Sequence, residues 1–201
     1  MFGYIYFATV MSVKEMFVNQ RDLADFTAQT DHHEPNLSFH LANELWKFFP
    51  WLNCDFDVKK TDHNKRPDII FHRRGCNTFN LLVVEVKRQS SPLVNGWICQ
   101  SDEEKISNYW FAEQLNYPFG VSLVMNEKTS EFAFALSRNN PRTVVRFASP
   151  NLDVQINDGV ASILERITAA KRRNPNAQTQ ILEHNLDMMV CRIYRSVDTN
   201  V

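Results

Sequence analysis

The chain of 201 residues contains few cysteines and no cysteine pair with the spacing of a metal or redox site. The four are Cys54, Cys76, Cys99 and Cys191. Isolated thiols of this kind are typical of a reduced, cytoplasmic protein rather than a disulfide-bonded secreted one. The six histidines form no ligand pattern either, and we expect the adjacent pair His32-His33 in a loop, so no zinc site is predicted.

The chain also lacks a glycine-rich phosphate loop, an internal repeat, a low-complexity tract and a long apolar run. Residues 1–10 are apolar and aromatic, but they have no basic lead and are far too short to span a bilayer. We therefore predict no secretory or transmembrane segment. We interpret residues 1–10 as an extra strand, or as a stretch that precedes a start at Met11.

The formal net charge is −1, so the overall charge gives no indication for or against nucleic acid as a partner. The length fits one domain with a small appendage at most. We expect residues 1–36 to form an N-terminal extension and helix, residues 37–136 a core, and residues 137–201 a C-terminal helical part packed on that core.

Two short apolar runs contain charged residues that call for an explanation. Residues 66–71 read Arg-Pro-Asp-Ile-Ile-Phe, and residues 81–87 read Leu-Leu-Val-Val-Glu-Val-Lys. Both runs are short, rich in β-branched residues and bounded by turn residues, which is typical of buried strands. Ionised side chains are rarely buried without partners. Glu85 and Lys87 are two residues apart and should project from the same face of one strand, whereas Val86 points the other way.

The segment between the two runs predicts how they pair. Residues 75–78, Gly-Cys-Asn-Thr, contain the glycine and asparagine that hairpin turns prefer. A hairpin centred between Cys76 and Asn77 places Asp68 directly opposite Glu85, with Cβ atoms on the order of 5 Å apart. Two carboxylates at this spacing repel each other unless a proton or a cation lies between them.

The facing carboxylates have two interpretations. Hard oxygen ligands at this spacing suit Mg²⁺ or Mn²⁺, with Lys87 holding a water molecule or an oxyanion beside them. Alternatively, the strands form a structural ion pair in which Lys87 bridges Asp68 or Glu85. We favour the metal site, because Pro67-Asp68 followed by Glu85-Val86-Lys87 is also a known pattern.

This pattern resembles the PD-(D/E)xK, or restriction-endonuclease-like, nuclease superfamily. The resemblance covers residues 38–125 and depends on a short motif in the context of two strands and a turn. It implies that Asp68 and Glu85 bind the metal together with the main-chain carbonyl of Val86, and that Lys87 positions or helps to deprotonate the attacking water. It also implies an additional acidic residue on the helix before these strands.

Glu44 is the candidate for that helical acidic residue. Residues 37–49 carry an apolar stripe formed by Leu37, Leu41, Leu45 and Phe48. At about 100° per residue, Glu44 lies beside this stripe rather than opposite it. Glu44 therefore either borders the core with its carboxylate in solvent or turns into a polar site, where it would bind a metal directly or through water.

Basic residues gather between residues 59 and 88. They are Lys59, Lys60, Lys65, Arg66, Arg73, Arg74, Lys87 and Arg88, against the acids Asp62, Asp68 and Glu85. A basic face around a metal site suits a phosphate backbone, although any one of these residues could simply be solvated at a hairpin end. Further along, Lys105 could reach a phosphate or lie exposed on a helix, and Trp97 could stack on a base or pack under its own loop.

The rest of the chain predicts alternating helices and strands. We expect helices over 13–28, 37–49, 102–116, 158–173 and 181–195, strands over 55–60, 119–125 and 131–136, and loops over 31–36 and 89–100. Ser101 followed by Glu104 predicts a capping box with Ser101 at the N-cap. The order indicates an α/β protein with a mixed central sheet flanked by helices. It is also the core order that the resemblance implies.

The sequence thus favours a cytoplasmic, Mg²⁺- or Mn²⁺-dependent nuclease that hydrolyses phosphodiester bonds, with DNA as the expected substrate. The alternative is a catalytically inactive domain of the same fold that binds nucleic acid or has a structural role. We expect no membrane partner. The oligomeric state is open, a homodimer included.

Overall fold

The computed structural model describes residues 1–201 except 20–32, 58–64, 90–98, 127, 149–157 and 199–201. In chain order the elements are α1 (Phe2–Asn19), α3 (His33–Trp46), β1 (Asn53–Phe56), β2 (Ile69–Arg73), β3 (Cys76–Arg88), α4 (Gln100–Lys105), the π-helical segment η1 (Ile106–Trp110), β4 (Phe119–Asn126), β5 (Glu131–Arg138), β6 (Thr143–Ala148), α5 (Asp158–Arg173) and α6 (Gln180–Asp198). The protein is therefore α/β, as predicted.

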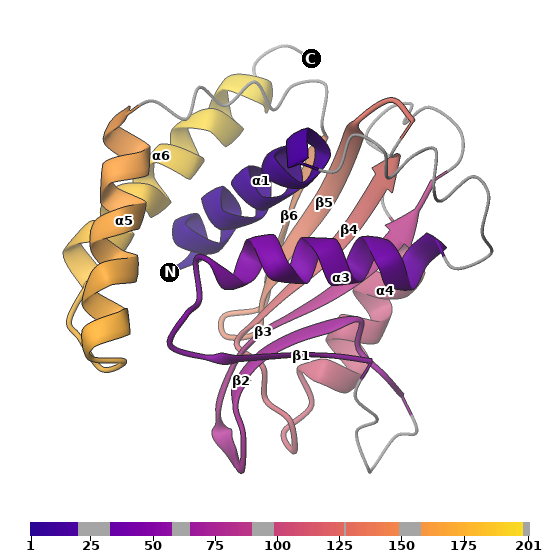
Figure 1. The fold of residues 1–201 in the computed structure, drawn as a ribbon, viewed down its shortest axis with the longest axis horizontal. Helices are drawn as coiled ribbons and strands as arrows, with labels where there is room; N and C mark the ends of the chain where they lie inside the picture. The colour runs from indigo at the N-terminus through magenta and orange to yellow at the C-terminus, as the bar shows by residue number, and fades with distance from the viewer. Residues whose placement is uncertain (20–32, 58–64, 90–98, 127, 149–157, 199–201) are drawn as a thin grey trace.

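One mixed sheet forms the centre of the molecule (Figure 1). Its strands lie in the order β1-β2-β3-β4-β5-β6, so every strand neighbours the next one in sequence. All pairs are antiparallel except β3 and β4, which are parallel. A parallel pair needs a crossover connection, and α4 with η1 supplies it.

The two faces of the sheet bury different sets of side chains. On β3, Val84 and Val86 belong to the larger apolar cluster, which also contains the buried residues of α1 and α3. Val83 belongs to a smaller cluster with Ile106 and Trp110 of η1. Because side chains alternate along a strand, this assigns one face of β3 to α1 and α3, and the other face to α4 and η1.

The N-terminal segment differs from the prediction. One expectation for residues 1–10 was an extra strand, but they belong to a single α-helix, Phe2–Asn19. Tyr4 to Ala8 are at most 1 % exposed and pack in the larger cluster. Their apolar side chains surround the helix because α3, α6 and β5 all contact it, and a helix that is hydrophobic all round is a buried one.

Several element boundaries also need correction. α3 begins at His33, within the segment expected as a loop, and β1 ends at Phe56 instead of Lys60. The N-cap of α4 is Cys99, so Ser101 lies inside the helix and the predicted capping box does not form. The strand β6 was not predicted. It supplies the edge of the sheet beside β5, so the segment from residue 137 onward is not purely helical.

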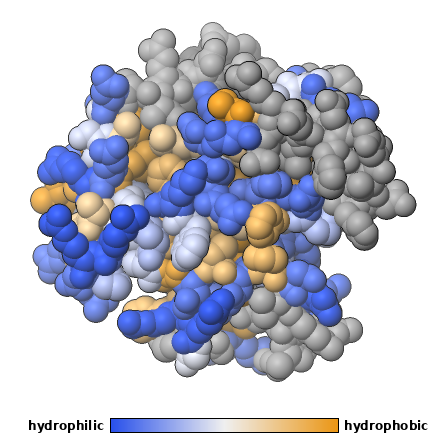
Figure 2. Space-filling model, in the orientation of Figure 1, coloured by the Kyte–Doolittle hydropathy of each residue, from blue (hydrophilic) through white to orange (hydrophobic). Residues whose placement is uncertain are grey.

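The three segments expected from the sequence share one core. The larger cluster includes Tyr4 of α1, Val84 of β3 and Leu186 of α6. Figure 1 shows α5 and α6 beside α1, at one side of the sheet. In the same orientation, Figure 2 shows a surface of hydrophilic side chains with separate apolar patches between them. Among the helices of the described residues, none is long and apolar enough to cross a membrane.

Candidate functional site

The structure places Asp68 and Glu85 at adjacent positions on one face of the sheet. Ile69 pairs with Val84, and Ile70 pairs with Val83. Asp68 immediately precedes β2, so the next pair in this register is Asp68 with Glu85. Ile70 and Val83 pack in the same cluster and so lie on one face of the sheet. Side chains two residues apart on a strand point to the same face, so Glu85 lies on the face of Val83, and Asp68 on the face of Ile70.

The turn that produces this register is not the predicted one. Arg73 pairs with Cys76, so the turn residues are Arg74 and Gly75, and Gly75 adopts the left-handed φ of 77°. Register shifts between Phe71 and Arg73 insert extra residues into β3. The predicted pairing near Asp68 is thus reached through an earlier turn and an irregular stretch of the hairpin.

Glu85 is a buried carboxylate with both oxygens bonded. Its side chain is 1 % exposed. The Lys105 ammonium forms an ion pair with Oε2, and the Trp110 indole N–H donates a hydrogen bond of 2.5 Å to Oε1. Both partners come from the crossover α4–η1, so the connection between the parallel strands closes over Glu85.

Burial controls the protonation of this carboxylate. Loss of solvent and, second to it, the negative charge of Asp68 raise the pKa of Glu85 from 4.5 to about 8. Lys105 and Trp110 act in the opposite direction through charge and hydrogen bonds. For Lys105, burial opposes the charged form, but the charge and hydrogen bond of Glu85 raise its pKa overall. A positive charge placed beside Glu85 and Asp68 therefore stabilises the site.

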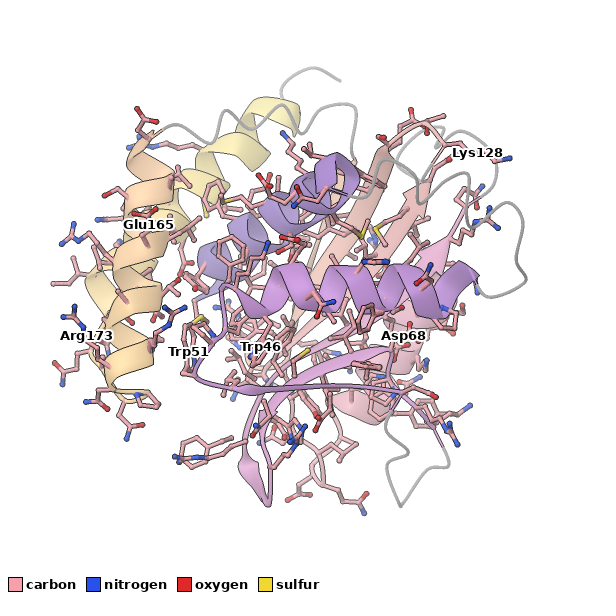
Figure 3. All side chains as sticks on the ribbon, viewed as in Figure 1. Trp46, Trp51, Asp68, Lys128, Glu165 and Arg173 are labelled. Atoms are coloured by element: carbon pink, nitrogen blue, oxygen red, sulfur yellow. The ribbon has the colours of Figure 1, made fainter. Side chains whose placement is uncertain are left out.

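Asp68 is fixed by the backbone of β3. The Val86 N–H donates a hydrogen bond of 2.6 Å to Asp68 Oδ2. In a β-strand, the N–H and C=O of one residue point to the same edge, so the Val86 carbonyl lies on the Asp68 side of β3. The three residues that the resemblance implies, Asp68, Glu85 and Val86, therefore lie near one another at the start of β2. Figure 3 labels Asp68 at this end of the sheet.

Lys87 is exposed on the same face of β3 as Glu85. It pairs in register with Val124, which packs in a small cluster with Cys99 at the start of α4. This placement brings a lysine to the rim of the carboxylate pair. Glu85 forms its ion pair with Lys105, a lysine on the crossover helix that the sequence did not place at this carboxylate.

Glu44 does not lie beside the carboxylate pair of Asp68 and Glu85. It forms an ion pair with Lys47, and its Oε1 lies 3.5 Å from the Asn19 amide nitrogen. The apolar stripe of α3 packs in the cluster that contains Val84 and Val86, on the opposite face of the sheet from Glu85. Among the residues that the structure describes, no group of three histidine, cysteine, aspartate or glutamate side chains is placed to hold a metal ion.

The basic residues do not form a single patch. Lys65, Arg66, Lys87 and Arg88 lie at the Asp68 end of the β2–β3 hairpin, and Arg73 and Arg74 lie at its turn. With about 3.3 Å per residue, the five residues of β2 separate these groups by about 16 Å. Lys59, Lys60 and Trp97 lie outside the described residues.

Several of these basic side chains already have acidic or aromatic partners. Arg66 pairs with Asp57 at 3.0 Å. The guanidinium of Arg74 bonds to Asp55 and, with His72, lowers the pKa of Asp55 to about 2. The Lys65 ammonium lies 5.3 Å from the centre of the Tyr109 ring. Arg66 and Arg74 therefore contribute less free positive charge than the sequence suggests.

Three residues of this site were not predicted. Trp110 binds Glu85 directly. Ser122 pairs in register with Glu85, is fully buried and has an Oγ without a hydrogen-bond partner. Asp102 lies one helical turn before Lys105, has a buried Oδ2 without a partner, and contributes to the raised pKa of Lys105. Periodicity alone does not reveal them, because their roles depend on the crossover packing on β3.

The donor set fits a small hard cation in part. Asp68 and Glu85 supply two carboxylates at facing positions, the Val86 carbonyl lies on the same side, and the unpartnered Ser122 hydroxyl could bind a metal-held water. Mg²⁺ keeps several waters and needs only one or two protein carboxylates. The Lys105 ammonium, however, is bonded to the Glu85 oxygen that the cation needs.

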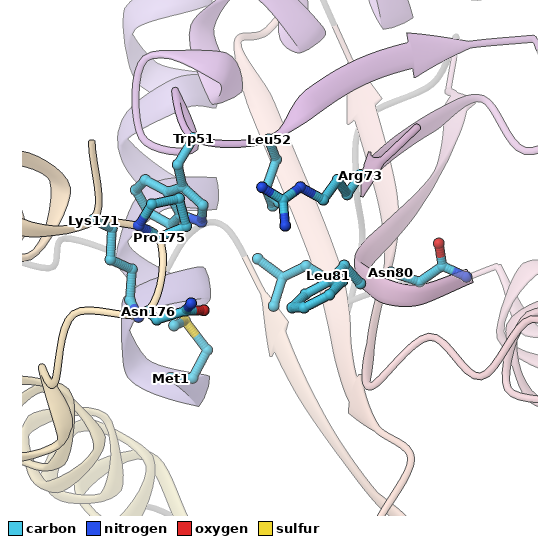
Figure 4. A pocket seen from close by; sticks show the side chains of 10 residues that line it. Met1, Trp51, Leu52, Arg73, Asn80, Leu81, Lys171, Pro175 and Asn176 are labelled. Atoms are coloured by element: carbon cyan, nitrogen blue, oxygen red, sulfur yellow. The ribbon is translucent and has the colours of Figure 1, made fainter. Parts of the chain in front are cut away.

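Two cavities lined by described residues lie away from the carboxylate pair. A cavity of about 200 Å³ opens between the β2–β3 hairpin and the segment after α5 (Figure 4), where Arg73 and Leu81 face Lys171 and Pro175. A second, of about 360 Å³, lies between α5 and the end of α3. Neither is lined by Asp68, Glu85, Lys87 or Lys105. These two cavities are therefore separate from the candidate site.

Comparisons with protein-family models, with curated proteins and with solved structures found no match for this chain. The function must therefore be argued from the site itself.

Proposed function

We propose that this protein is a metal-dependent nuclease that hydrolyses phosphodiester bonds, with DNA as its substrate and Mg²⁺ or Mn²⁺ as its cofactor. The observation that carries the proposal is the pair Asp68–Glu85, which shares one face of the sheet with the exposed Lys87. The order α3-β1-β2-β3-α4-β4, with β3 parallel to β4, supports it, since this is the core order that the resemblance implies. A cytoplasmic location is part of the same proposal.

The proposed chemistry assigns a separate role to each side chain. When bound, the cation would lower the pKa of a water molecule and neutralise charge that develops on the phosphate. Asp68 and Glu85 would hold it with the Val86 carbonyl. The exposed Lys87 would orient the attacking water and donate hydrogen bonds to a phosphoryl oxygen. Glu44 has no part in this mechanism, because it lies on a helix that packs on the opposite face.

A second candidate function also has support from a specific observation. Both oxygens of Glu85 accept hydrogen bonds from protein side chains, Oε2 from Lys105 and Oε1 from Trp110. A buried ion pair of this kind can be purely structural. The domain would then be catalytically inactive and would bind nucleic acid or hold a partner through another surface.

Cleavage assays with the two motif variants separate these functions. Labelled DNA and RNA, in single-stranded and duplex form, are incubated with the protein and Mg²⁺, Mn²⁺ or EDTA. We expect cleavage with Mg²⁺ or Mn²⁺ and none with EDTA. Lys87→Ala should lose cleavage and keep Mg²⁺ binding in calorimetry, because an ammonium cannot ligate a cation, and Glu85→Ala should lose both. Cleavage that continues unchanged in EDTA would contradict the proposal.

A further inference from the structure

The Lys105 ammonium is bonded to Oε2 of Glu85, and a metal at this site would compete with the lysine for that oxygen. Glu85 is almost completely buried, so few positions around its carboxylate are open to a ligand. Oε1 is taken by Trp110 and Oε2 by Lys105. A divalent cation shared with Asp68 must approach the side of Glu85 that faces the lysine ammonium.

Two cations cannot share this carboxylate at low cost. Lys105 is only partly exposed, with 26 % of its side chain in solvent, so water screens the repulsion weakly. Glu85 and Asp68 together attract one ammonium or one divalent ion, but an ammonium beside a divalent ion is repelled. Binding of the metal and the Lys105–Glu85 contact should therefore exclude each other.

The structure offers a position for the displaced ammonium. Asp102 and Lys105 are three residues apart on α4, a spacing that puts side chains on the same face of a helix. Asp102 has a buried Oδ2 without a hydrogen-bond partner, and its charge already acts on Lys105. A short rotation of the lysine side chain would keep it beside the carboxylate pair after it leaves Glu85.

We propose that Lys105 is the resident counter-ion of the metal site, that a divalent cation displaces it from Glu85, and that the freed ammonium then contacts the phosphate of the substrate. This inference rests on the proposed nuclease function. It adds to that function a substrate-contacting residue outside the two-strand motif, whose contact changes when the metal binds. It also gives the crossover helix a part in the site.

Calorimetry with Mg²⁺ and no nucleic acid tests the exchange. Lys105→Met removes the ammonium and keeps an unbranched chain. Because Mg²⁺ then no longer competes with an ammonium for Glu85, its affinity should rise about tenfold, a typical size for the coupling between two binding events. The matched control is Lys47→Met, because Lys47 also pairs with a glutamate, Glu44, whose helix α3 packs on the opposite face of the sheet. Its Mg²⁺ affinity should equal that of the parent.

The outcomes distinguish the inference from the function on which it rests. If the parent binds Mg²⁺ and Lys105→Met binds it no more tightly, the exchange is overturned and the metal site stands. If only Lys105→Met binds Mg²⁺, the exchange is supported. If neither binds Mg²⁺, the proposed metal-dependent function fails, and the inference fails with it.

A second measurement needs no variant and covers the case in which Lys105→Met does not fold. Reductive methylation of the parent, followed by mass spectrometry, reports how fast each lysine amine reacts. Lys105 should react slowly without metal and several-fold faster with saturating Mg²⁺, and Lys47 should not change. A Lys105 rate that is the same with and without bound Mg²⁺ would overturn the exchange.

Discussion

At the residue scale, Glu85 is the least ordinary group of the described chain. It is a carboxylate with 1 % exposure, and it has one cation and one indole N–H as its partners. A buried charge is costly unless it is paired and hydrogen-bonded. The partners of Glu85 reduce this cost without removing it, because burial still raises the pKa of Glu85 to about 8. The free energy of unfolding should therefore depend on pH through the protonation of Glu85.

Glu85→Gln should flatten the dependence of stability on pH. The folded state holds the Glu85 proton more tightly than the unfolded state, whose carboxyl has the ordinary pKa of 4.5. The free energy of unfolding of the parent should therefore fall as pH rises from about 5 to about 8, with a slope approaching 1.4 kcal/mol per pH unit from this group. Urea titrations across this range measure it. If the free energy of unfolding changes with pH in the same way in the parent and in Glu85→Gln, the expectation is contradicted.

Asp68→Asn should keep or raise stability in the absence of metal. The substitution removes a negative charge that faces Glu85, and the asparagine oxygen can still accept the Val86 N–H. We expect a gain of up to about 1 kcal/mol in the free energy of unfolding, together with weaker Mg²⁺ binding in calorimetry. A clear loss of stability would favour the structural ion pair instead.

At the element scale, the crossover α4–η1 determines what covers Glu85. It can approach the sheet closely because β4 has Gly120 at the point of contact. A Cβ added to Gly120 would lie 2.4 Å from Cγ2 of Ile106, in the first turn of η1. The same segment carries Trp110, so the contact between strand and π-helix also sets the position of the indole.

Gly120→Ala should therefore weaken both the fold and the site. Displacement of η1 is expected to cost about 1–3 kcal/mol, as in other overpacked cores, and to change the fluorescence of Trp110. Ser122→Ala is the control on the same strand, since it keeps the Cβ and removes only an unpartnered hydroxyl. Thermal unfolding and tryptophan emission measure both variants. Equal stability of Gly120→Ala and the parent would show that η1 adjusts at no cost.

At the scale of the whole molecule, the N-terminal helix belongs to the core. Removal of residues 1–10 would take away Tyr4, Ile5, Phe7 and Val10, each at most 1 % exposed. At about 1.5–3 kcal/mol for each buried side chain, the loss approaches the whole stability of a typical domain, about 5–15 kcal/mol. A chain that starts at Met11 should therefore fail to fold.

Circular dichroism and solubility of this shortened chain check the expectation. Val18→Ala is the control on the same helix, because Val18 is 57 % exposed. It should change the free energy of unfolding by no more than about 0.5 kcal/mol. A shortened chain with a cooperative thermal transition at the parent's temperature would contradict the view that α1 completes the core.

Patterns along the chain were enough to predict the mixed α/β class, both motif strands, and the register of β2 with β3 that extends to Asp68 and Glu85. These follow from local rules, because β-branched runs predict strands and the period of two assigns each side chain to a face. Local rules failed for residues 1–10, since an apolar segment has the same composition in a strand and in a buried helix. They also failed for β6, which is short and sits at the edge of the sheet.

The groups that surround Glu85 depend on how the helices pack on the sheet. The sequence places Glu44 and Lys105 on helices, but helix periodicity does not say which face of the sheet each helix covers. Packing puts α3 in the cluster of Val84 and Val86, on the face opposite Glu85, so Glu44 does not reach the site. It puts η1 against Val83, and the crossover thereby brings Lys105 and Trp110 to Glu85. The physical reason is that the identity of a site depends on long-range packing between elements, whereas pattern and propensity act only along the chain.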